Sequence, residues 1–154
     1  MSDEDARSFL TSQRVAHVGV VDAEGWRYVI PLVYVYPGAE VLYLHNGAHE
    51  QSHFWNAVKA NPRLCIEVDE IGPVHPGKRF ACDSSLVYSS VVAFGSVRII
   101  DERERKTWFF DRLLEKYGSP EFKFEPGYPA LDRIVLYEMQ LEIVTGKRSE
   151  GLYH

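Results

Sequence analysis

The sequence predicts a mainly β fold with short helices, arranged as a small closed or split barrel of six antiparallel strands. Its 154 residues, of which 45% are apolar, match the size and composition of a single globular domain spanning residues 1–154. Runs rich in β-branched residues alternate with turn residues through the first half of the chain. In residues 135–143, apolar side chains at every second position alternate with a set that is polar except for Leu136, which is typical of an antiparallel strand with one solvent-exposed face.

The elements of the first half follow from turn and cap residues. Ser2 and Asp5 resemble a capping box, which predicts a helix over residues 2–13 that covers the barrel as a lid. Residues 15–21 and 27–36 form a predicted hairpin around the turn Asp22-Ala23-Glu24-Gly25. After the turn at Pro37-Gly38, a third strand over residues 40–45 completes an antiparallel meander.

Helices and strands then alternate. The spacing of Phe54, Trp55 and Val58 predicts a helix that ends at Asn61-Pro62, because proline cannot continue it. A strand follows at residues 64–68, and the glycines and prolines of residues 72–77 predict a loop without regular structure. Residues 88–100 form a long strand in which Gly95 marks a bend or a close approach of another backbone.

Helical spacing returns at residues 101–117, where the aromatic residues 108–110 are expected to pack in the core. Residues 118–132 predict a surface loop that leads into the alternating strand at 135–143. With that last strand the predicted elements are six strands and three short helices.

Composition excludes several classes of protein. With 17 basic and 22 acidic residues the chain lacks the positive charge that nucleic-acid binding requires. The longest apolar stretch, residues 28–36, is interrupted by Pro31 and is far too short to span a membrane. Cys65 and Cys82 are too few for a disulfide framework, and the acidic start is unlike a signal peptide, so a cytoplasmic location is expected. The length also excludes separate nucleotide and substrate lobes, unless a second chain supplies part of the site.

One motif raises a metal alternative. His49-Glu50-Gln51-Ser52-His53 matches HExxH, the spacing at which two histidines on a helix bind zinc and the glutamate acts as general base. However, Asn46-Gly47 would place His49 in the first helical turn, and the candidates for a third ligand, Glu67 and Glu70, belong to a strand. We therefore keep a zinc metalloprotease as a weaker alternative and assign no metal site.

The end of the third strand favours a phosphate site. His45 is followed by Asn46-Gly47 and then by a helix start at Ser52 and His53. Such a start presents free backbone N–H groups and the positive end of the helix dipole, both of which suit a phosphate. An ordinary helix start with exposed histidines is the alternative. P-loop, dinucleotide-binding and nucleophile-elbow motifs are absent from the sequence.

The order of several short segments resembles the FMN-binding split-barrel family related to pyridoxamine 5′-phosphate oxidase, especially its nitroimidazole-resistance-like branch. The resemblance covers roughly residues 5–148. The segments that carry it are residues 22–25 with 28–32, 42–45, 61–69, 88–95 and 143–147.

This resemblance implies a six-stranded antiparallel split β-barrel that forms a homodimer, with FMN in two equivalent clefts between the protomers. One set of implied contacts borders the isoalloxazine ring, the ribityl chain and the phosphate: Ile30, Pro31 and Leu32 at the ring, Leu44, His45 and Asn46 at the ring and ribityl chain, and Ser52 and His53 at the phosphate. A second set reaches the cleft from the later strands: Tyr88, Ser89, Ser90 and Val91, with Lys147 as a positive charge. A proline such as Pro31 interrupts strand pairing and leaves backbone groups free for the ring edge.

The implied activity is that of an oxidoreductase that reduces a small flat or nitroaromatic substrate with electrons from NADH or NADPH. A bound flavin does this redox chemistry itself, so the absence of a catalytic triad does not argue against the activity, and no catalytic residue is assigned. The basic phosphate clamp and the C-terminal tryptophan strand of the vitamin B6 oxidases are not evident. The alternative is a non-catalytic protein that binds or carries FMN or haem, with His45 or His53 as an axial haem ligand.

Overall fold

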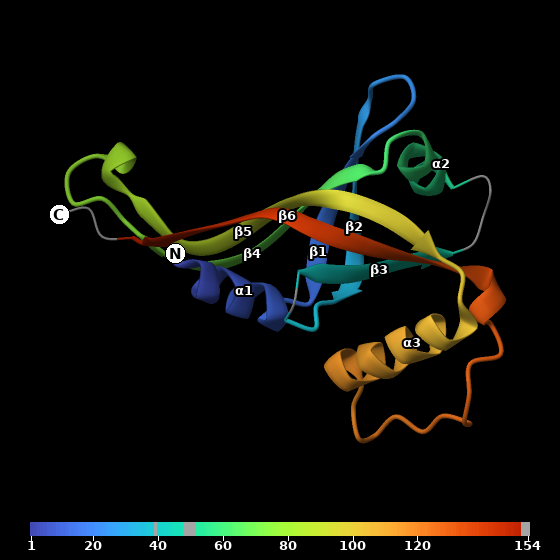
Figure 1. Ribbon diagram of the computed structural model, residues 1–154. Helices are drawn as coiled ribbons and strands as arrows, with labels where there is room; N and C mark the ends of the chain where they lie inside the picture. Colours follow the sequence, from blue (N-terminus) through green and yellow to red (C-terminus); the bar gives the residue numbers. More distant parts are fainter. Residues whose placement is uncertain (39, 48–51, 152–154) are drawn as a thin grey trace.

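Six strands among the described residues close into one antiparallel barrel, as the sequence predicts (Figure 1). The structure is a computed structural model that describes residues 1–38, 40–47 and 52–151. Around the barrel the strands follow the order β1-β2-β3-β6-β5-β4. The elements are α1 (Asp3–Ser12), β1 (Val15–Val21), β2 (Arg27–Val35), β3 (Val41–Gly47), α2 (His53–Ala60), β4 (Arg63–His75), β5 (Ser85–Ile100), α3 (Arg103–Tyr117) and β6 (Ile134–Glu150), with single 3-10 turns at Ala81–Asp83 and Leu131–Arg133.

The barrel interior is filled by every second side chain of each strand, because successive residues of a strand point to opposite faces. Val18, Leu44 and Tyr137 are completely buried there. Helix α1 covers part of this core with Ala6 and Leu10, as the lid prediction requires. Its capping box is also confirmed, since the Ser2 and Asp5 side chains bond reciprocally to each other's backbone N–H groups.

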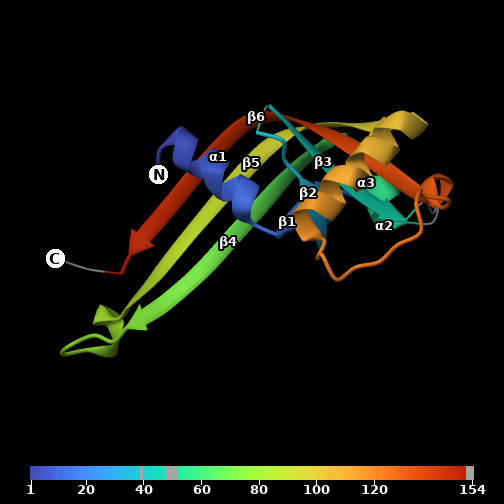
Figure 2. The ribbon, with the colours of Figure 1, turned by 90° about the horizontal axis from the view of Figure 1, so that it is seen from below.

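The strands β4, β5 and β6 continue beyond the barrel as a projecting arm, which we define as residues 70–89 together with 147–151 (Figure 2). The prediction of an irregular loop at residues 72–77 is wrong for residues 72–75, because β4 continues to His75, and is confirmed for Pro76 and Gly77. Pairing with β5 holds this stretch, and a register shift between Ile71 and Val74 accommodates the intervening Gly-Pro pair. The last strand is likewise longer than predicted and reaches Glu150.

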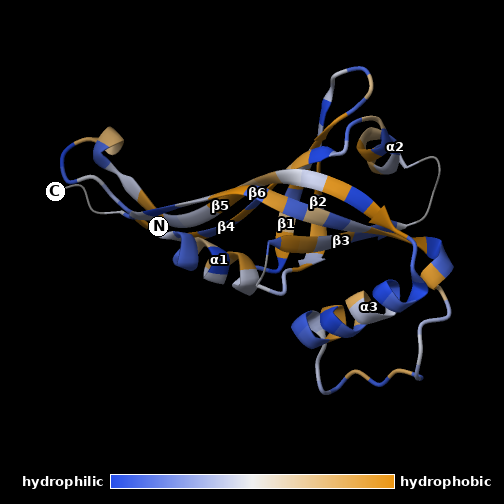
Figure 3. Cartoon of the chain, viewed as in Figure 1, coloured by the Kyte–Doolittle hydropathy of each residue, from blue (hydrophilic) through white to orange (hydrophobic). Residues whose placement is uncertain are grey.

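Helix α3 builds a second, smaller core against the outside of the barrel. Phe109 is fully buried, and Trp108 and Phe110 pack beside it, which confirms that these aromatic residues belong to a core. The prediction for β6 is wrong at Leu136. The face of β6 that carries Leu136 was expected to be exposed to solvent, but α3 covers it and Leu136 is completely buried. Figure 3 shows the hydrophobic residues concentrated on the strands, with hydrophilic residues prominent on α3.

Two features bear on the environment of the protein. Cys65 on β4 and Cys82 in the arm are both free thiols. Within the part of the chain that the structure describes, no helix has both the length and the apolar character needed to cross a membrane.

Candidate functional site

Strands β2 and β3 separate soon after they meet, and this leaves an opening in the barrel wall. Their ladder contains only the pairs Tyr34 with Leu44 and Val35 with Tyr43. Beyond these pairs, β2 pairs only with β1 among the described strands, whereas β3 pairs with β6 as far as Gly47. Pro31 does not interrupt the β1 ladder, where it lies opposite His17, which corrects one part of the expectation. Instead, residues 28–33 of β2 have no ladder partner among the described residues on the edge that faces β3.

The start of α2 lies across this β2–β3 opening. Ser52 is the N-cap, and its Oγ accepts a hydrogen bond from Trp55 N at 3.4 Å. Asn46, near the end of β3, donates from Nδ2 to the same Oγ at 3.3 Å and accepts at Oδ1 from the Tyr137 hydroxyl at 3.0 Å. The predicted helix start is therefore present, and polar groups of β3, β6 and α2 meet beside it.

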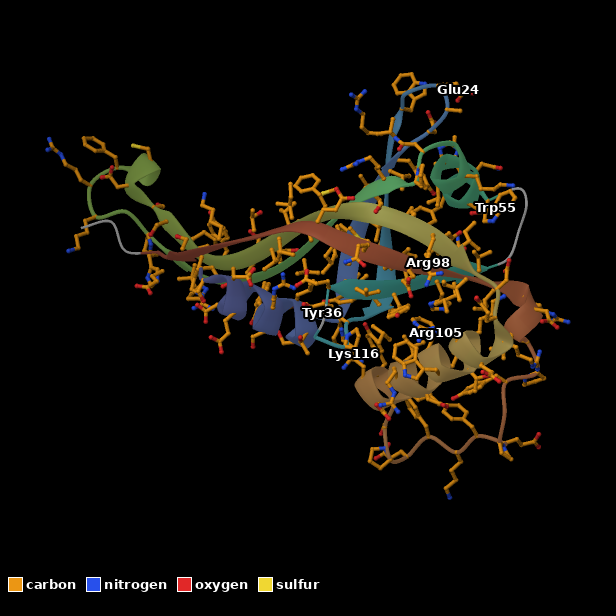
Figure 4. The ribbon with its side chains drawn as sticks, viewed as in Figure 1. Glu24, Tyr36, Trp55, Arg98, Arg105 and Lys116 are labelled. Atoms are coloured by element: carbon orange, nitrogen blue, oxygen red, sulfur yellow. The ribbon has the colours of Figure 1, made fainter. Side chains whose placement is uncertain are left out.

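A histidine–aspartate pair completes this cluster. His53 Nε2 lies 3.2 Å from Asp22 Oδ2, and the ring edge of His53 contacts Tyr28 of β2 with centroids 4.6 Å apart. The Asp22 side chain is only 7% exposed, whereas that of His53 is 50% exposed. Sequence reasoning treated Asp22 as a turn residue only, because no local pattern shows which distant side chain it meets. Figure 4 shows Glu24 of the β1–β2 turn and Trp55 of α2 at the same end of the molecule.

The other predicted residues of β2 and β3 lie at different depths. The side chains of Ile30 and Leu32 are partly buried against the core, and Pro31 is exposed on the outer face. Leu44 is completely buried inside the barrel. Ile30 and Leu32 therefore lie beside the opening, while Leu44 can face it only through its backbone.

His45 points away from the opening. It follows Leu44 on the strand, so its side chain lies on the opposite face, where its ring is 5.1 Å from that of Phe109 and 5.6 Å from that of Phe110. Its Nδ1 is buried without a hydrogen-bond partner among the described residues. The predicted grouping of the His45 and Asn46 side chains is therefore not observed. Burial under α3 lowers the pKa of His45, because desolvation disfavours the charged imidazolium.

The lowered pKa predicts that the stability contributed at His45 is lost in mild acid. The unfolded chain binds a proton at His45 more readily than the folded chain, so the free energy of unfolding falls as pH drops below the ordinary histidine pKa and is restored above it. We expect His45→Leu to flatten this dependence in urea unfolding measured at about pH 5 and about pH 7.5. His17→Gln, which changes an exposed histidine, should keep the slope; a slope unchanged by His45→Leu would contradict the assignment.

The second predicted set of residues lies where the arm joins the barrel, with Tyr88, Ser89 and Lys147 in the arm and Ser90 and Val91 just inside the barrel. Ser90 pairs with Lys147, Lys147 Nζ is 5.6 Å from the Tyr88 ring centroid, and Arg148 donates from Nε to Ser89 Oγ at 3.2 Å. Val91 is buried in the core. Asn46 pairs with Val135, twelve positions before Lys147 on β6, which corresponds to roughly 40 Å along an extended strand. One chain therefore does not bring the two sets together (Figure 1).

An apolar stripe runs around the outside of the barrel between these two sets. Its residues stand in register across five strands, and we call them the apolar wall: Val29, Gly19, Cys65, Phe94 and Ile143. Val29, Phe94 and Ile143 are 60%, 43% and 54% exposed. Ile143 is thus not buried in the chain as its place in the alternating strand suggested. A groove of about 430 Å³ lies along the wall, bordered by Arg27 and Arg63.

The HExxH motif is only partly within the described structure. His49, Glu50 and Gln51 lie outside the described residues, and His53 is paired with Asp22. Among the residues that are described, one group of three could offer metal ligands, namely His17, Glu67 and Asp69, whose ligand atoms lie within 4.8 Å of one another. This group lies on the outer surface of β1 and β4 and shares no residue with the motif.

The sequence profile of the pyridoxamine 5′-phosphate oxidase family matches residues 2–148. The chain belongs to this family. The match extends over nearly the whole pyridoxamine 5′-phosphate oxidase-like barrel, including the arm, and confirms the resemblance drawn from the short segments. None of the curated proteins with which the sequence was compared is significantly similar to it.

Solved structures show the same pyridoxamine 5′-phosphate oxidase-like fold. A protein of Bacteroides thetaiotaomicron, provisionally named for 5-nitroimidazole antibiotic resistance, has a TM-score of 0.77 and 23% identity, with 94% of this chain and 82% of that chain covered. An FAD-binding protein of Mesorhizobium loti has a TM-score of 0.70 and 23% identity, covering 97% and 96%. A flavocytochrome of Azotobacter vinelandii has a TM-score of 0.81 and 16% identity, covering 97% and 68%.

Proposed function

We propose that this protein is an FMN-dependent oxidoreductase whose flavin site is built by two copies of the chain. The observation that carries the proposal is the separation of the two predicted sets of site residues, one at the β2–β3 opening and one where the arm joins the barrel. Membership of the pyridoxamine 5′-phosphate oxidase family and the likeness to flavin-binding structures support a flavin as the cofactor.

The groups around the β2–β3 opening suit the parts of FMN. The partly buried Ile30 and Leu32, with Pro31 between them, offer an apolar border and unpaired backbone groups to a flat ring. Asn46 and Ser52 offer polar groups to the ribityl chain, and the start of α2 offers N–H groups to the phosphate. In this arrangement the chain's own residues bind and orient the cofactor and exclude water from it.

A second copy of the chain is the partner that completes the site. In a two-fold dimer the same surface of each copy meets its equivalent, so two identical clefts form. The apolar wall suits the centre of such an interface, because Val29, Phe94 and Ile143 would be removed from water. Antiparallel packing of two barrels then brings the arm of one copy, with Tyr88 and Lys147, to the opening of the other.

A bound flavin supplies the redox chemistry, so the proposed activity needs no proton-transfer triad. We place a small flat or nitroaromatic substrate beside the ring and take NADH or NADPH as the electron donor. The free thiols of Cys65 and Cys82 support a reducing, cytoplasmic setting. The haem alternative has less support at His45, which α3 encloses, and rests on the half-exposed His53.

Titration of the purified protein with FMN, followed by absorption spectroscopy and by mass determination in solution, tests the proposal. We expect flavin bands in a species with the mass of a dimer. A protein that stays colourless in excess FMN would overturn the cofactor assignment, and a monomer that binds FMN tightly would overturn the shared site. If FMN binds, oxidation of NADH or NADPH with a nitroaromatic acceptor supports the enzyme, whereas no oxidation supports a carrier.

Replacing Lys147 by alanine is expected to weaken FMN binding by about tenfold, because the variant removes a charged group from the shared cleft. Quenching of FMN fluorescence measures the dissociation constant. Lys123→Ala is the matched control, since Lys123 is an exposed lysine of the loop after α3. Equal affinities of the Lys147→Ala variant and the control would remove Lys147 from the site.

A further inference from the structure

We propose that Asp22 is a positioning residue that makes the His53 imidazolium a cation of the flavin phosphate site, beside the Lys147 that the second copy contributes to the cleft. This inference rests on the proposed function and adds to it a pH-dependent affinity. It starts from a contact that no local sequence pattern predicts, the 3.2 Å approach of His53 Nε2 to Asp22 Oδ2. The pair lies where the β1–β2 turn meets the first residue of α2.

The Asp22 carboxylate is fixed by its own turn. Its Oδ1 accepts hydrogen bonds from Glu24 N at 3.0 Å and from Trp26 N at 2.8 Å, which leaves Oδ2 for His53. Two backbone donors and near-complete burial hold the carboxylate in one orientation. His53 is oriented in turn by Oδ2 on one side and by the Tyr28 ring on another.

This orientation determines what His53 offers to a phosphate. When Nε2–H donates to Asp22, a neutral ring has only the lone pair of Nδ1 left, and this lone pair repels an anion. The protonated ring donates from both nitrogens, one to Asp22 and one to the ligand, and carries a positive charge. Because the His53 side chain is half exposed, a ligand can reach the ring.

Within one chain, the other described groups around His53 do not replace that charge. Among the described residues, the titratable side chains in contact with His53 are Asp22 of the turn and Tyr28 of β2. Asn46 and Ser52, which lie beside it, are neutral. On α2 itself, Lys59 lies over the Trp55 ring at 4.2 Å from its centroid. Among the described residues of this chain, His53 is therefore the side chain at the helix start that can carry a positive charge toward the phosphate.

The expected pH dependence has a sign that distinguishes this cation from a permanent one. A phosphate monoester gains its second charge near pH ~6, so a permanent cation would bind FMN more tightly as pH rises. An imidazole loses its charge between about pH 5 and about pH 8. We expect the affinity for FMN to fall about tenfold between about pH 6 and about pH 8.5. Riboflavin, which has no phosphate, should bind with nearly constant affinity.

Three variants, each first checked for a wild-type thermal transition, test the roles separately by FMN and riboflavin fluorescence titration. His53→Lys keeps a cation at the helix start and should abolish the fall of FMN affinity with pH. Asp22→Asn should weaken FMN binding at about pH 6 and make the fall shallower, since the amide cannot form a charge-assisted contact with the protonated ring. Glu24→Gln removes a charge from the same turn but keeps the Asp22–His53 contact, and should behave as wild type.

The outcomes separate this inference from the function on which it rests. If the wild-type protein binds neither flavin, the proposed function fails. If it binds FMN with an affinity that stays constant or rises with pH, only the role of His53 is overturned. If Asp22→Asn and Glu24→Gln give the same pH profile, Asp22 is not the positioning residue. A fall that is equally steep for riboflavin would show that His53 does not act on the phosphate.

Discussion

Phe94→Glu is expected to convert the proposed dimer into monomers and to abolish FMN binding. Phe94 lies in the apolar wall, in register with Cys65 and Ile143, and is 43% exposed in the single chain. A carboxylate placed in an apolar interface loses its hydration, which costs several kcal/mol by itself and twice that in a two-fold dimer. Analytical ultracentrifugation and FMN titration of the same sample measure both effects.

The control for this prediction is Phe122→Glu. Phe122 lies in the loop after α3 and is 55% exposed, close to the exposure of Phe94. The two variants therefore introduce the same change at similarly exposed phenylalanines in different places. This variant should remain dimeric and bind FMN as the wild-type protein does. A dimeric, FMN-binding Phe94→Glu variant would show that the apolar wall is not the interface, and a monomeric one that still binds FMN would show that a single chain suffices.

Gly95→Ala is expected to lower the free energy of unfolding by about 3 kcal/mol or more, which is the upper range for overpacking. A Cβ at this position would overlap the backbone carbonyl oxygen of Gln140 on β6 and crowd the Met139 side chain. The register between β5 and β6 shifts at Phe94 and Gly95, so the close approach predicted from the sequence is confirmed. Urea unfolding should show a markedly lower midpoint.

Gly19→Ala provides the comparison on the same barrel. A Cβ at Gly19 would meet Cys65 O at 3.7 Å, an ordinary contact, and the expected loss of stability is small. Equal midpoints for the two variants would mean that β5 and β6 can separate at Gly95 without cost, which would contradict the close packing of their backbones.

Most of the fold could be predicted because its signals are local. The capping box at Ser2, the turn after Asp22 and the proline after Asn61 act within a few residues, and the alternation in residues 135–143 reports strand structure directly. Predictions failed where a distant element changed the outcome. The Gly-Pro pair of residues 72–73 resembles a loop until β5 pairs with it, and Leu136 resembles a wet position until α3 covers it.

The candidate site divides in the same way. The family, the barrel and the helix start at Ser52 could be predicted, because cap residues, side-chain alternation and the order of short segments are properties of neighbouring residues. The contact of Asp22 with His53, the packing of His45 against α3, and the position of Lys147 roughly 40 Å along β6 from the opening emerge only in the folded chain. Those relations depend on which strands pair and in which register, and long-range pairing leaves no local pattern in the sequence.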